Sequence, residues 1–238
     1  MPFDPNIPIQ QRVSMLSRTT DRLSAQDILQ GVLDGRAGKI AMVSSFGADS
    51  VVLLHMIAQI DQSTPVLFLD TRMLFRATLL YQKDVTDHLG LTDVRVITPD
   101  PGEVLVRDNE GLLYHADTNA CCVLRKVEPL QNALRGFDGW ITGRKRHQSQ
   151  TRAQLDVWED DGAGRLKVNP LAGWNVDDLQ NYMNTHNLPR HPLVTKGYPS
   201  IGCEPCTFRQ KPELDARSGR WAGQSKTECG IHLPSPTS

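Results

Sequence analysis

Short apolar runs alternate along the chain with longer segments in which apolar residues recur at helical spacing. The short runs have the length of buried strands, and they lie at 39–45, 64–70, 94–98, 139–143 and 165–169. The segments with helical spacing lie at 24–33, 49–59, 74–89, 120–134 and 175–186. Strands that alternate with helices predict an α/β fold, a mostly parallel twisted sheet with helices on both faces.

Local signals indicate where several of these helices begin and end. Ser24 with Asp27 three residues later is typical of a helix start, and Asn175 is a second candidate cap. Gly90 can end the helix at 74–89. After Asn187 proline, glycine and basic residues become frequent and long apolar runs disappear, which predicts a loop-rich, mobile C-terminal tail with a disordered end at 234–238.

Composition narrows the class of protein. The chain has 238 residues, which suits one globular domain, and 39% hydrophobic with 22% charged residues argues against wholesale disorder. A net charge of −1 argues against a basic nucleic-acid-binding surface, so no nucleic-acid partner is expected. No apolar run approaches the ~20 residues that span a bilayer, and residues 1–12 lack a secretory signal, so we expect a cytoplasmic protein without membrane contact.

The chain has five cysteines, and none precedes Cys121. In the cytoplasm such residues are more often metal ligands or catalytic groups than structural disulfides. Four of them form two pairs, Cys121 with Cys122 and Cys203 with Cys206, and four thiolates can hold either zinc or an iron–sulfur cluster. Adjacent cysteines do not easily chelate one small ion, which favours a [4Fe–4S] cluster. The alternative is that all four are small buried core residues.

Cys229 has no cysteine partner once these four are assigned. A single thiol in a polar, mobile tail is a poor core residue and a good candidate nucleophile. The alternative is an exposed cysteine without a role. His232 lies three residues later, where it could lower the pKa of Cys229 or simply be solvated.

Several polar segments follow predicted strands, where ligands bind in parallel sheets. The loop 44–50 is rich in small residues and precedes a helix, so its backbone N–H groups could hold a phosphate or sulfate. The alternative is that Asp49 and Ser50 only cap that helix. Basic residues lie beside the strand ends and the cysteines, and arginine suits bidentate recognition of such anions. These residues are Arg125, Lys126, Arg144, Arg152, Arg217 and Arg220.

The loop 44–50 resembles the PP-loop Ser-Gly-Gly-x-Asp-Ser of the adenine nucleotide alpha hydrolases, with Phe46 in place of the first glycine. Six motifs in order resemble the bacterial adenylyl-sulfate (APS) reductases. They are Ser45-Phe-Gly-Ala-Asp-Ser50, Phe68-Leu-Asp-Thr71, Cys121-Cys-x-x-Arg-Lys126, Gly143-Arg-x-x-x-Gln-Ser-x-Thr-Arg152, Cys203-x-x-Cys-Thr207 and Glu228-Cys-Gly-Ile-His232. The chain departs from this family at Arg72, commonly glycine, and at Arg76, often proline.

The resemblance implies an adenine nucleotide alpha hydrolase-like reductase domain at 1–208 and a flexible segment at 209–238 that carries the catalytic Cys229. It implies reduction of APS to sulfite and AMP through a sulfonate on Cys229, with a separate thioredoxin as electron donor. The implied [4Fe–4S] ligands are Cys121, Cys122, Cys203 and Cys206. The implied substrate-binding residues are Ser44, Ser45, Gly47, Asp49, Leu69, Lys126, Arg144, Arg217, Arg220 and His232.

Three other functions stay open on the sequence. The first is a reductase of phosphoadenylyl sulfate (PAPS), or of both sulfonucleotides. The second is an ATP-using PP-loop enzyme such as a tRNA thiolase, against which Phe46 counts. The third is a zinc- or cluster-bearing binding module without catalysis. The oligomeric state, a homo-oligomer included, is open as well.

Overall fold

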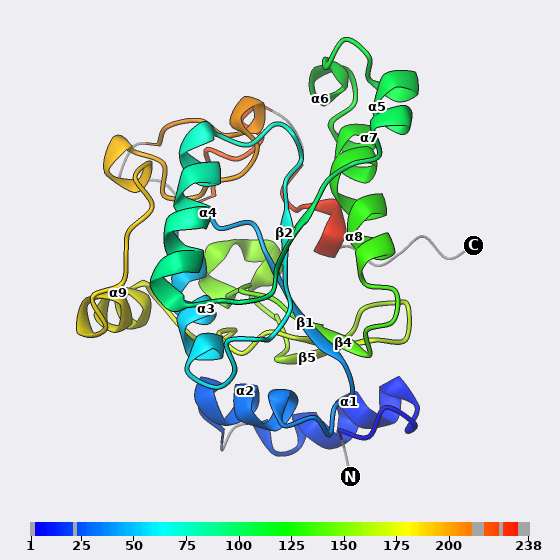
Figure 1. Cartoon of the computed structure of the whole chain (residues 1–238), viewed down its shortest axis with the longest axis vertical. Coiled ribbons are helices and arrows are strands. Elements are labelled where there is room, and N and C mark those ends of the chain that lie inside the picture. Colours follow the sequence, from blue (N-terminus) through cyan, green and yellow to red (C-terminus); the bar gives the residue numbers. More distant parts are fainter. Residues whose placement is uncertain (1–2, 21–22, 211–216, 224–225, 233–238) are drawn as a thin grey trace.

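A computed structural model describes residues 3–20, 23–210, 217–223 and 226–232. Its strands form one sheet in the order β3-β2-β1-β4-β6-β5, in which only the pair of β5 and β6 is antiparallel (Figure 1). The strands are β1 (Ile40–Ser44), β2 (Val66–Leu69), β3 (Val94–Ile97), β4 (Gly139–Ile141), β5 (Trp158–Asp160) and β6 (Leu166–Val168). The predicted α/β fold with a mostly parallel sheet is confirmed.

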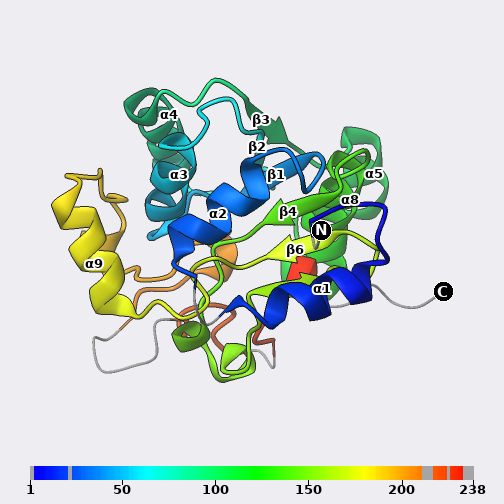
Figure 2. The ribbon, with the colours of Figure 1, turned by 90° about the horizontal axis from the view of Figure 1, so that it is seen from below.

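Helices lie on both sides of this sheet (Figure 2). The α-helices are α1 (Ile9–Ser17), α2 (Ala25–Leu33), α3 (Ser50–Ala58), α4 (Arg76–Leu89), α5 (Pro101–Arg107), α6 (Leu113–Ala116), α7 (Thr118–Cys122), α8 (Glu128–Ala133) and α9 (Val176–Thr185). The 3₁₀ turns are η3 (Arg146–Gln148), η4 (Gln150–Arg152), η5 (Val194–Lys196), η6 (Glu204–Cys206) and η7 (Gly230–His232), and η2 (Val123–Val127) is a π-helix.

The alternation of side chains along β1 shows why helices pack on both faces of the sheet. Ile40 and Met42 join the larger apolar cluster with α2, α3, α4 and α9. Ala41 and Val43 point the other way and pack with Leu130 of α8. Successive side chains of a strand face opposite sides, so a strand that is apolar throughout is buried only between two layers.

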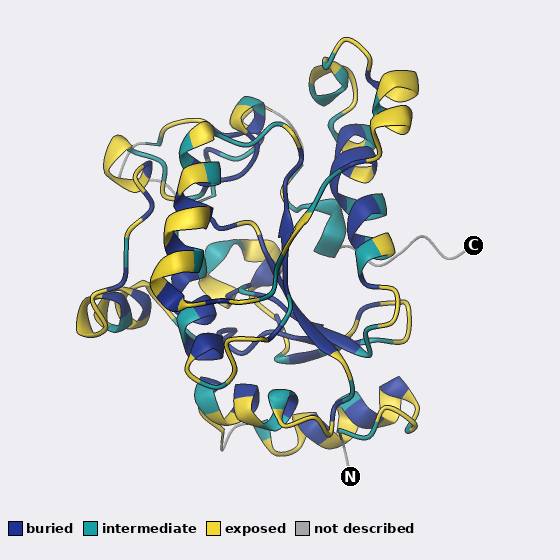
Figure 3. Ribbon diagram, viewed as in Figure 1, coloured by how far each residue is buried: buried dark blue, intermediate teal, exposed yellow. Residues whose placement is uncertain are grey.

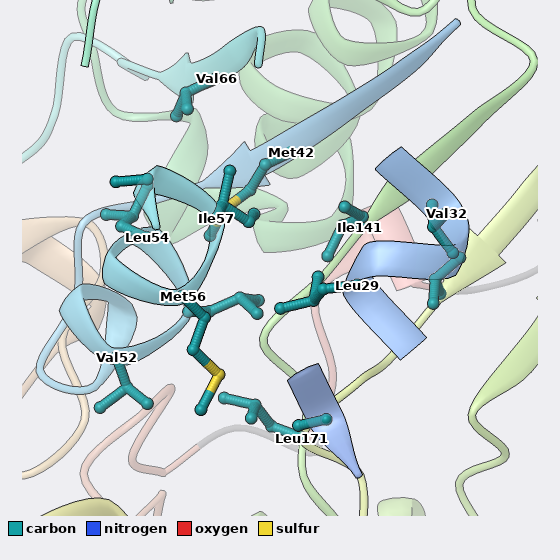
Figure 4. Packing of buried hydrophobic residues seen from close by; sticks show 14 of the residues in the cluster. Leu29, Val32, Met42, Val52, Leu54, Met56, Ile57, Val66, Ile141 and Leu171 are labelled. Atoms are coloured by element: carbon teal, nitrogen blue, oxygen red, sulfur yellow. The ribbon is translucent and has the colours of Figure 1, made fainter. Parts of the chain in front are cut away.

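The larger cluster lies between α3, α2 and the sheet (Figure 4). Ile57 of α3 lies next to Met42 of β1, and Leu29 of α2 lies next to Ile141 of β4. Figure 3 shows the central strands buried, while the outward sides of α4 and α9 are exposed. This rigid layer holds the strand ends on which the candidate site is built.

The predicted helix starts are confirmed in detail. Ser24 and Asp27 form a reciprocal capping box, and Asn175 does the same with Asp178. Gly90 ends α4 with φ +65°, a left-handed conformation that favours glycine.

Sequence reasoning missed α1, α5, α6 and β5. The stretch Asp100-Pro-Gly has the composition of a turn, yet Asp100 caps α5 by accepting hydrogen bonds from the backbone of Gly102 and Glu103 at 2.8 and 3.0 Å. The strand β5 has three residues, which is too short for a periodic signal. The expected helix at 120–134 is a longer run interrupted by the π-turn η2.

Beyond Asn187, the described residues contain 3₁₀ turns and isolated bridges but no α-helix or strand, as expected for a loop-rich tail. The predicted disordered end at 234–238 lies outside the described residues, as does part of 209–238. None of the helices described is long and apolar enough to cross a membrane.

Candidate active site

A cleft of about 320 Å³ opens where β1, β2 and β4 end. These three strands are parallel neighbours, so their carboxyl ends meet at one edge of the sheet. The chain runs from β1 through β2 to β3 on one side and then crosses to β4 on the other side of β1. Ligands bind at such switch points in open α/β sheets.

Every residue assigned to substrate from the sequence lines this cleft, together with Cys229. These residues are Ser44, Ser45, Gly47, Asp49, Leu69, Lys126, Arg144, Arg217, Arg220 and His232. Among the four proposed cluster ligands, Cys203 lines the cleft, whereas Cys121, Cys122 and Cys206 are buried outside its lining. The fold therefore gathers the candidate residues at one place, although their roles stay predictions.

The loop after β1 has an unusual backbone at Phe46, whose φ is +47°. Its side chain is fully buried and packs edge-on against Phe68 with ring centroids 5.1 Å apart. The side-chain oxygen of Ser44 accepts a hydrogen bond from the Phe46 backbone at 3.1 Å, which holds the turn. Glycine adopts a left-handed backbone without strain, so the glycine of the ATP-cleaving PP-loops suits this position and Phe46 retains the conformation by burying its ring.

Asp49 lies at the N-cap position of α3, but its side chain makes no capping hydrogen bond. Its carboxylate lies 3.4 Å from the ammonium of Lys145, which also donates to the Gly143 carbonyl at 3.0 Å. Burial lowers the pKa of Lys145, and the charge of Asp49 opposes that shift. Sequence reasoning missed the role of Lys145 because the pairing joins two loops that are far apart in the chain.

The segment after β2 contains Arg72, where the resemblance leads us to expect glycine. Arg72 has φ +58°, a left-handed conformation that favours glycine. Its side chain is largely exposed and lies 3.8 Å from Asp70. The neighbouring Thr71 hydroxyl contacts the Cys203 sulfur at 3.2 Å, so this strand end reaches the cysteine region.

The two cysteine pairs come from a helix and a distant loop. Cys121 and Cys122 end α7, and Cys203 is joined to the end of β2 by a bridge to Leu74 and by the Glu204 N–H, which donates to the Met73 carbonyl at 2.8 Å. All four thiols are free and buried. The pKa of Cys121 is raised to about 11, first by burial and then by the neighbouring sulfurs of Cys203 and Cys206.

These four thiols match the donor set of a [4Fe–4S] cluster, which takes four cysteine thiolates. Within the part of the chain that the structure describes, no three His, Cys, Asp or Glu side chains are grouped as they would be around one metal ion. A single tetrahedral zinc ion draws its ligands to ~2.3 Å from the metal, whereas a cluster spreads its ligands over several irons. The residues present therefore supply the four thiols that such a cluster takes.

The π-turn η2 follows the tandem cysteines and orients two buried cations. Arg125 donates to the Asp108 carboxylate at 2.7 and 3.1 Å and to the Thr71 carbonyl at 3.2 Å. Lys126 turns into the cleft. Burial opposes its charge, but the sulfurs of Cys203, Cys229 and Cys122 raise the pKa of Lys126 above its usual value. The extra residue of a π-turn shifts the side chains that follow it around the helix axis, and such turns are frequent at functional sites.

Cys229 is half-buried and lines the cleft near η2, where the short helix η7 lies beside the run of α7 and α8 (Figure 1). A hydrogen bond with Cys122 and then the charge of Lys126 lower the pKa of Cys229 well below its usual value, against the effect of burial. Two cations, Lys126 and Arg220, therefore act on this thiol in addition to its hydrogen bonds.

The cations of the cleft fall into two groups. Arg144 pairs with Glu159, Lys145 with Asp49, and Glu228 pairs with both Arg152 and Arg217. Among the described residues, no carboxylate forms an ion pair with Lys126 or with Arg220, and both influence the pKa of Cys229. The side of the cleft that faces Cys229 is therefore suited to an anion.

His232 stacks parallel to Trp140, with ring centroids 6.3 Å apart and an interplanar angle of 9°. Burial, followed by the charge of Arg144 and other nearby cations, lowers the pKa of His232 well below its usual value. The ring is consequently neutral at pH 7, and it packs at the cleft wall rather than standing in solvent.

Residues 39–209 match the family described as the phosphoadenosine phosphosulfate reductase domain. A protein of Mesorhizobium japonicum, named adenosine 5'-phosphosulfate reductase, is 54% identical over 195 residues, covering 82% of this chain and 76% of its own length. The chain belongs to the phosphoadenosine phosphosulfate reductase family. A second relative of the same name, from Mycolicibacterium smegmatis, is 40% identical and covers 88% of this chain and 89% of its own length.

Solved structures agree with the family. The phosphoadenylyl-sulfate reductase of Candida auris superimposes with a TM-score of 0.71 at 26% identity, covering 84% of this chain and 97% of that one. The FMN adenylyltransferase of Candida glabrata shares the fold alone, with a TM-score of 0.56 at 16% identity. As a member of the reductase family, this chain is an oxidoreductase.

Proposed function

We propose that this protein reduces adenylyl sulfate to sulfite and AMP in sulfate assimilation, with Cys229 as the nucleophile. The observation that carries the proposal is the half-buried Cys229 thiol, which lines a cleft together with Lys126 and Arg220. Among the described residues no carboxylate pairs with these two cations, and cations of this kind next to a thiol suit the attack of a thiolate on an anionic group. The names of the relatives at 54% and 40% identity support APS as the substrate.

In the first step the Cys229 thiolate attacks the sulfur of APS. A bond forms between Sγ and that sulfur, and the bond from sulfur to the bridging phosphate oxygen breaks. AMP departs with the electron pair of the broken bond, and Cys229 carries an S-sulfonate. Lys126 and Arg220 lie where they can stabilise the sulfate oxygens, while Arg144 and Arg217 can bind the phosphate as AMP leaves.

The nucleotide itself belongs at the strand ends. The loop from Ser44 through Ser45 and Gly47 to Asp49 offers backbone N–H groups, and Leu69 ends the neighbouring strand β2. His232, stacked on Trp140, closes the cleft wall near Cys229. This arrangement binds the adenosine and phosphate in one cleft with the thiol at its sulfate end.

The second step needs a dithiol reductant, for which we propose thioredoxin in the cytoplasm. One thiolate of thioredoxin attacks Sγ of Cys229 and releases sulfite, which forms a mixed disulfide. The second thiol of thioredoxin then displaces the Cys229 thiolate, so thioredoxin is oxidised by two electrons and Cys229 is regenerated. The exchange requires no redox coenzyme on the enzyme.

Cys121, Cys122, Cys203 and Cys206 would hold a [4Fe–4S] cluster. When bound, the cluster supplies a covalent link between α7 and the loop at 203–206 and an electrostatic influence on Lys126. The thiols of Cys229 and thioredoxin already account for the electrons of the reaction. Anaerobically purified protein is expected to contain four iron and four sulfide per chain, as a [4Fe–4S] cluster requires, and zinc in their place contradicts the cluster.

Replacement of Cys229 by serine tests the nucleophile. Cys229→Ser is expected to abolish sulfite release from APS, at least 1,000-fold, because a serine hydroxyl is not ionised at neutral pH. AMP binding is expected to persist, measured by calorimetry. Wild-type protein incubated with APS without thioredoxin should carry a sulfonate on Cys229 by mass spectrometry.

Normal turnover by Cys229→Ser contradicts the mechanism. Parallel assays with APS and PAPS test the substrate, because a PAPS reductase would favour PAPS. Lys126→Ala in protein that retains its iron tests the influence of the cluster on Lys126, and normal APS reduction by that variant argues against it.

A further inference from the structure

The residue before the proposed nucleophile is held by two arginines of the cleft. The Glu228 carboxylate accepts hydrogen bonds from Arg152 at 2.6 and 2.7 Å and from Arg217 at 3.3 Å. The same carboxylate accepts the backbone N–H of Cys229 at 2.8 Å. One carboxylate therefore connects the backbone at Cys229 to η4, which lies 76 residues earlier in the chain.

This connection is shielded from water. The side chains of Glu228 and Arg152 are 11% and 6% exposed. Two parallel N–H···O bonds from one guanidinium fix both position and orientation, and they are stronger when water is excluded. Bonding to Arg152 and Arg217 keeps the pKa of Glu228 below its usual value although burial acts in the opposite direction, so the carboxylate is charged at pH 7.

Cys229 itself forms a hydrogen bond with Cys122. Further contacts of the segment 226–232 lie on either side of Cys229. Lys226 donates to Asn119, and the Gly230 backbone packs against Val127 so closely that a Cβ there would lie 3.0 Å from its Cγ2. The His232 ring stacks on Trp140, and the His232 backbone N–H donates to the Cys229 carbonyl at 3.0 Å. Glu228 makes the charged link nearest to the thiol.

The pairing also divides the charge of the cleft. The single charge of Glu228 is shared between Arg152 and Arg217 and offsets one of their two positive charges, while Lys126 and Arg220 have no carboxylate partner among the described residues. An anion that enters the cleft is attracted most strongly to the pair without carboxylates. These two cations are the ones next to the Cys229 thiol.

We propose that Glu228 is a positioning residue for Cys229: its pairing with Arg152 and Arg217 holds the Cys229 backbone over the cleft and leaves Lys126 and Arg220 for the substrate anion. The inference rests on the proposed function, since it assigns the geometry of that nucleophile. Loss of the pairing moves the thiol away from the substrate without removing any cation that binds the substrate.

Glu228→Gln tests the proposal. The amide still accepts the Cys229 N–H, but it replaces one acceptor oxygen with a donor and ends the bidentate pairing. We expect kcat for APS reduction to fall at least tenfold, while the Kd for AMP by calorimetry stays unchanged or decreases, because Arg152 and Arg217 keep their charges and lose the counter-ion that Glu228 provides. Glu228→Asp keeps the charge and should recover part of kcat. Glu110→Gln, the same change at an exposed site, should match wild type.

Two measurements need no sulfonucleotide. In Glu228→Gln, hydrogen–deuterium exchange at 226–232 should rise at least tenfold and alkylation of Cys229 by iodoacetamide should change at least threefold, with the melting temperature as a check of folding. If wild-type protein does not reduce APS, the proposed function fails, while the exchange result still decides the role of Glu228.

Exchange at 226–232 that equals wild type overturns the proposal, as does a kcat within twofold of wild type. If weaker AMP binding by Glu228→Gln accounts for the whole loss of activity, Glu228 acts in substrate binding. That result also overturns the proposal. If Glu228→Gln does not fold, the same exchange measurement on Glu228→Asp decides, with unchanged exchange as the contrary result.

Discussion

Gly202 and Arg220 share one position in the cleft wall. A Cβ on Gly202 would lie 2.2 Å from Nη2 and 2.3 Å from Cζ of Arg220, so the guanidinium occupies the volume that any other side chain would need. The same guanidinium stacks over the Trp221 ring at 4.7 Å. The Arg220 guanidinium is packed between Gly202 and the Trp221 ring, and this packing sets its position. The position is available only because Gly202 has no side chain.

Gly202→Ala is therefore expected to displace Arg220 and weaken the binding of substrate. We expect the KM for APS to rise about tenfold, or ~1.4 kcal/mol, from the loss of one charged hydrogen bond. Steady-state kinetics and AMP calorimetry measure this effect. Gly173→Ala is the control, because the nearest atom to its Cβ lies at 3.8 Å. Equal KM values for both variants would show that Arg220 has room to move.

At the scale of elements, the π-turn η2 is held from outside by a buried ion pair. Arg125 and Asp108 have side chains that are 6% and 2% exposed, and Asp108 also accepts the Leu113 N–H at 2.8 Å. Arg125 reaches the Thr71 carbonyl at the end of β2 as well. These contacts join the segment between α5 and α6, the π-turn and the sheet around the cysteines.

Asp108→Asn leaves the buried charge of Arg125 without its counter-ion. We expect a loss of about 3–5 kcal/mol in the free energy of unfolding, measured by urea denaturation, together with a lower iron content after purification. Asp93→Asn, which breaks the surface pair of Asp93 with Arg95, should cost less than about 1 kcal/mol. A similar small loss for Asp108→Asn would mean that the region around η2 adapts without the pair.

At the scale of the whole molecule, the cleft depends on segments that meet only after folding. The ends of β1 and β2 contribute Ser44 and Leu69, η2 contributes Lys126, and the C-terminal part contributes Arg220 and Cys229. His191 belongs to this packing: it is fully buried, its Nε2 lies 3.0 Å from the Thr78 hydroxyl of α4, and its Nδ1 accepts the Leu193 N–H.

Burial lowers the pKa of His191 from 6.5 to about 4. The unfolded chain therefore takes up a proton near pH 6.5 that the folded protein refuses until about pH 4, so this residue destabilises the fold progressively as the pH falls between those values. From pH 7 to pH 5 we expect a contribution of about 2 kcal/mol, measured by urea unfolding.

His191→Gln should remove that part of the pH dependence, whereas His88→Gln, at an exposed histidine, should retain it. An unchanged pH profile in His191→Gln would mean that the imidazole is protonated inside the fold. Both variants replace histidine with glutamine, at a buried site in one and at an exposed site in the other. Their comparison therefore isolates the effect of burying the imidazole ring.

The sequence by itself determined the strands of the parallel sheet, the caps of α2 and α9, the paired cysteines and the loop 44–50 after the first strand. These follow from local signals: apolar period, capping side chains and the position of polar residues after strands. Family resemblance added the candidate roles and the candidate substrate-binding residue Leu69.

Only the tertiary structure decided which of these residues meet. The partners of Glu228 and Lys145 come from distant loops, the π-turn interrupts a run with ordinary helical composition, and β5 is stabilised by pairing with β6. Each of these features depends on contacts between segments far apart in the chain, and local sequence patterns do not predict such contacts. Cys229 is recognisable in the sequence as a candidate nucleophile, but the two arginines that pair with the neighbouring Glu228 become visible only once the chain is folded.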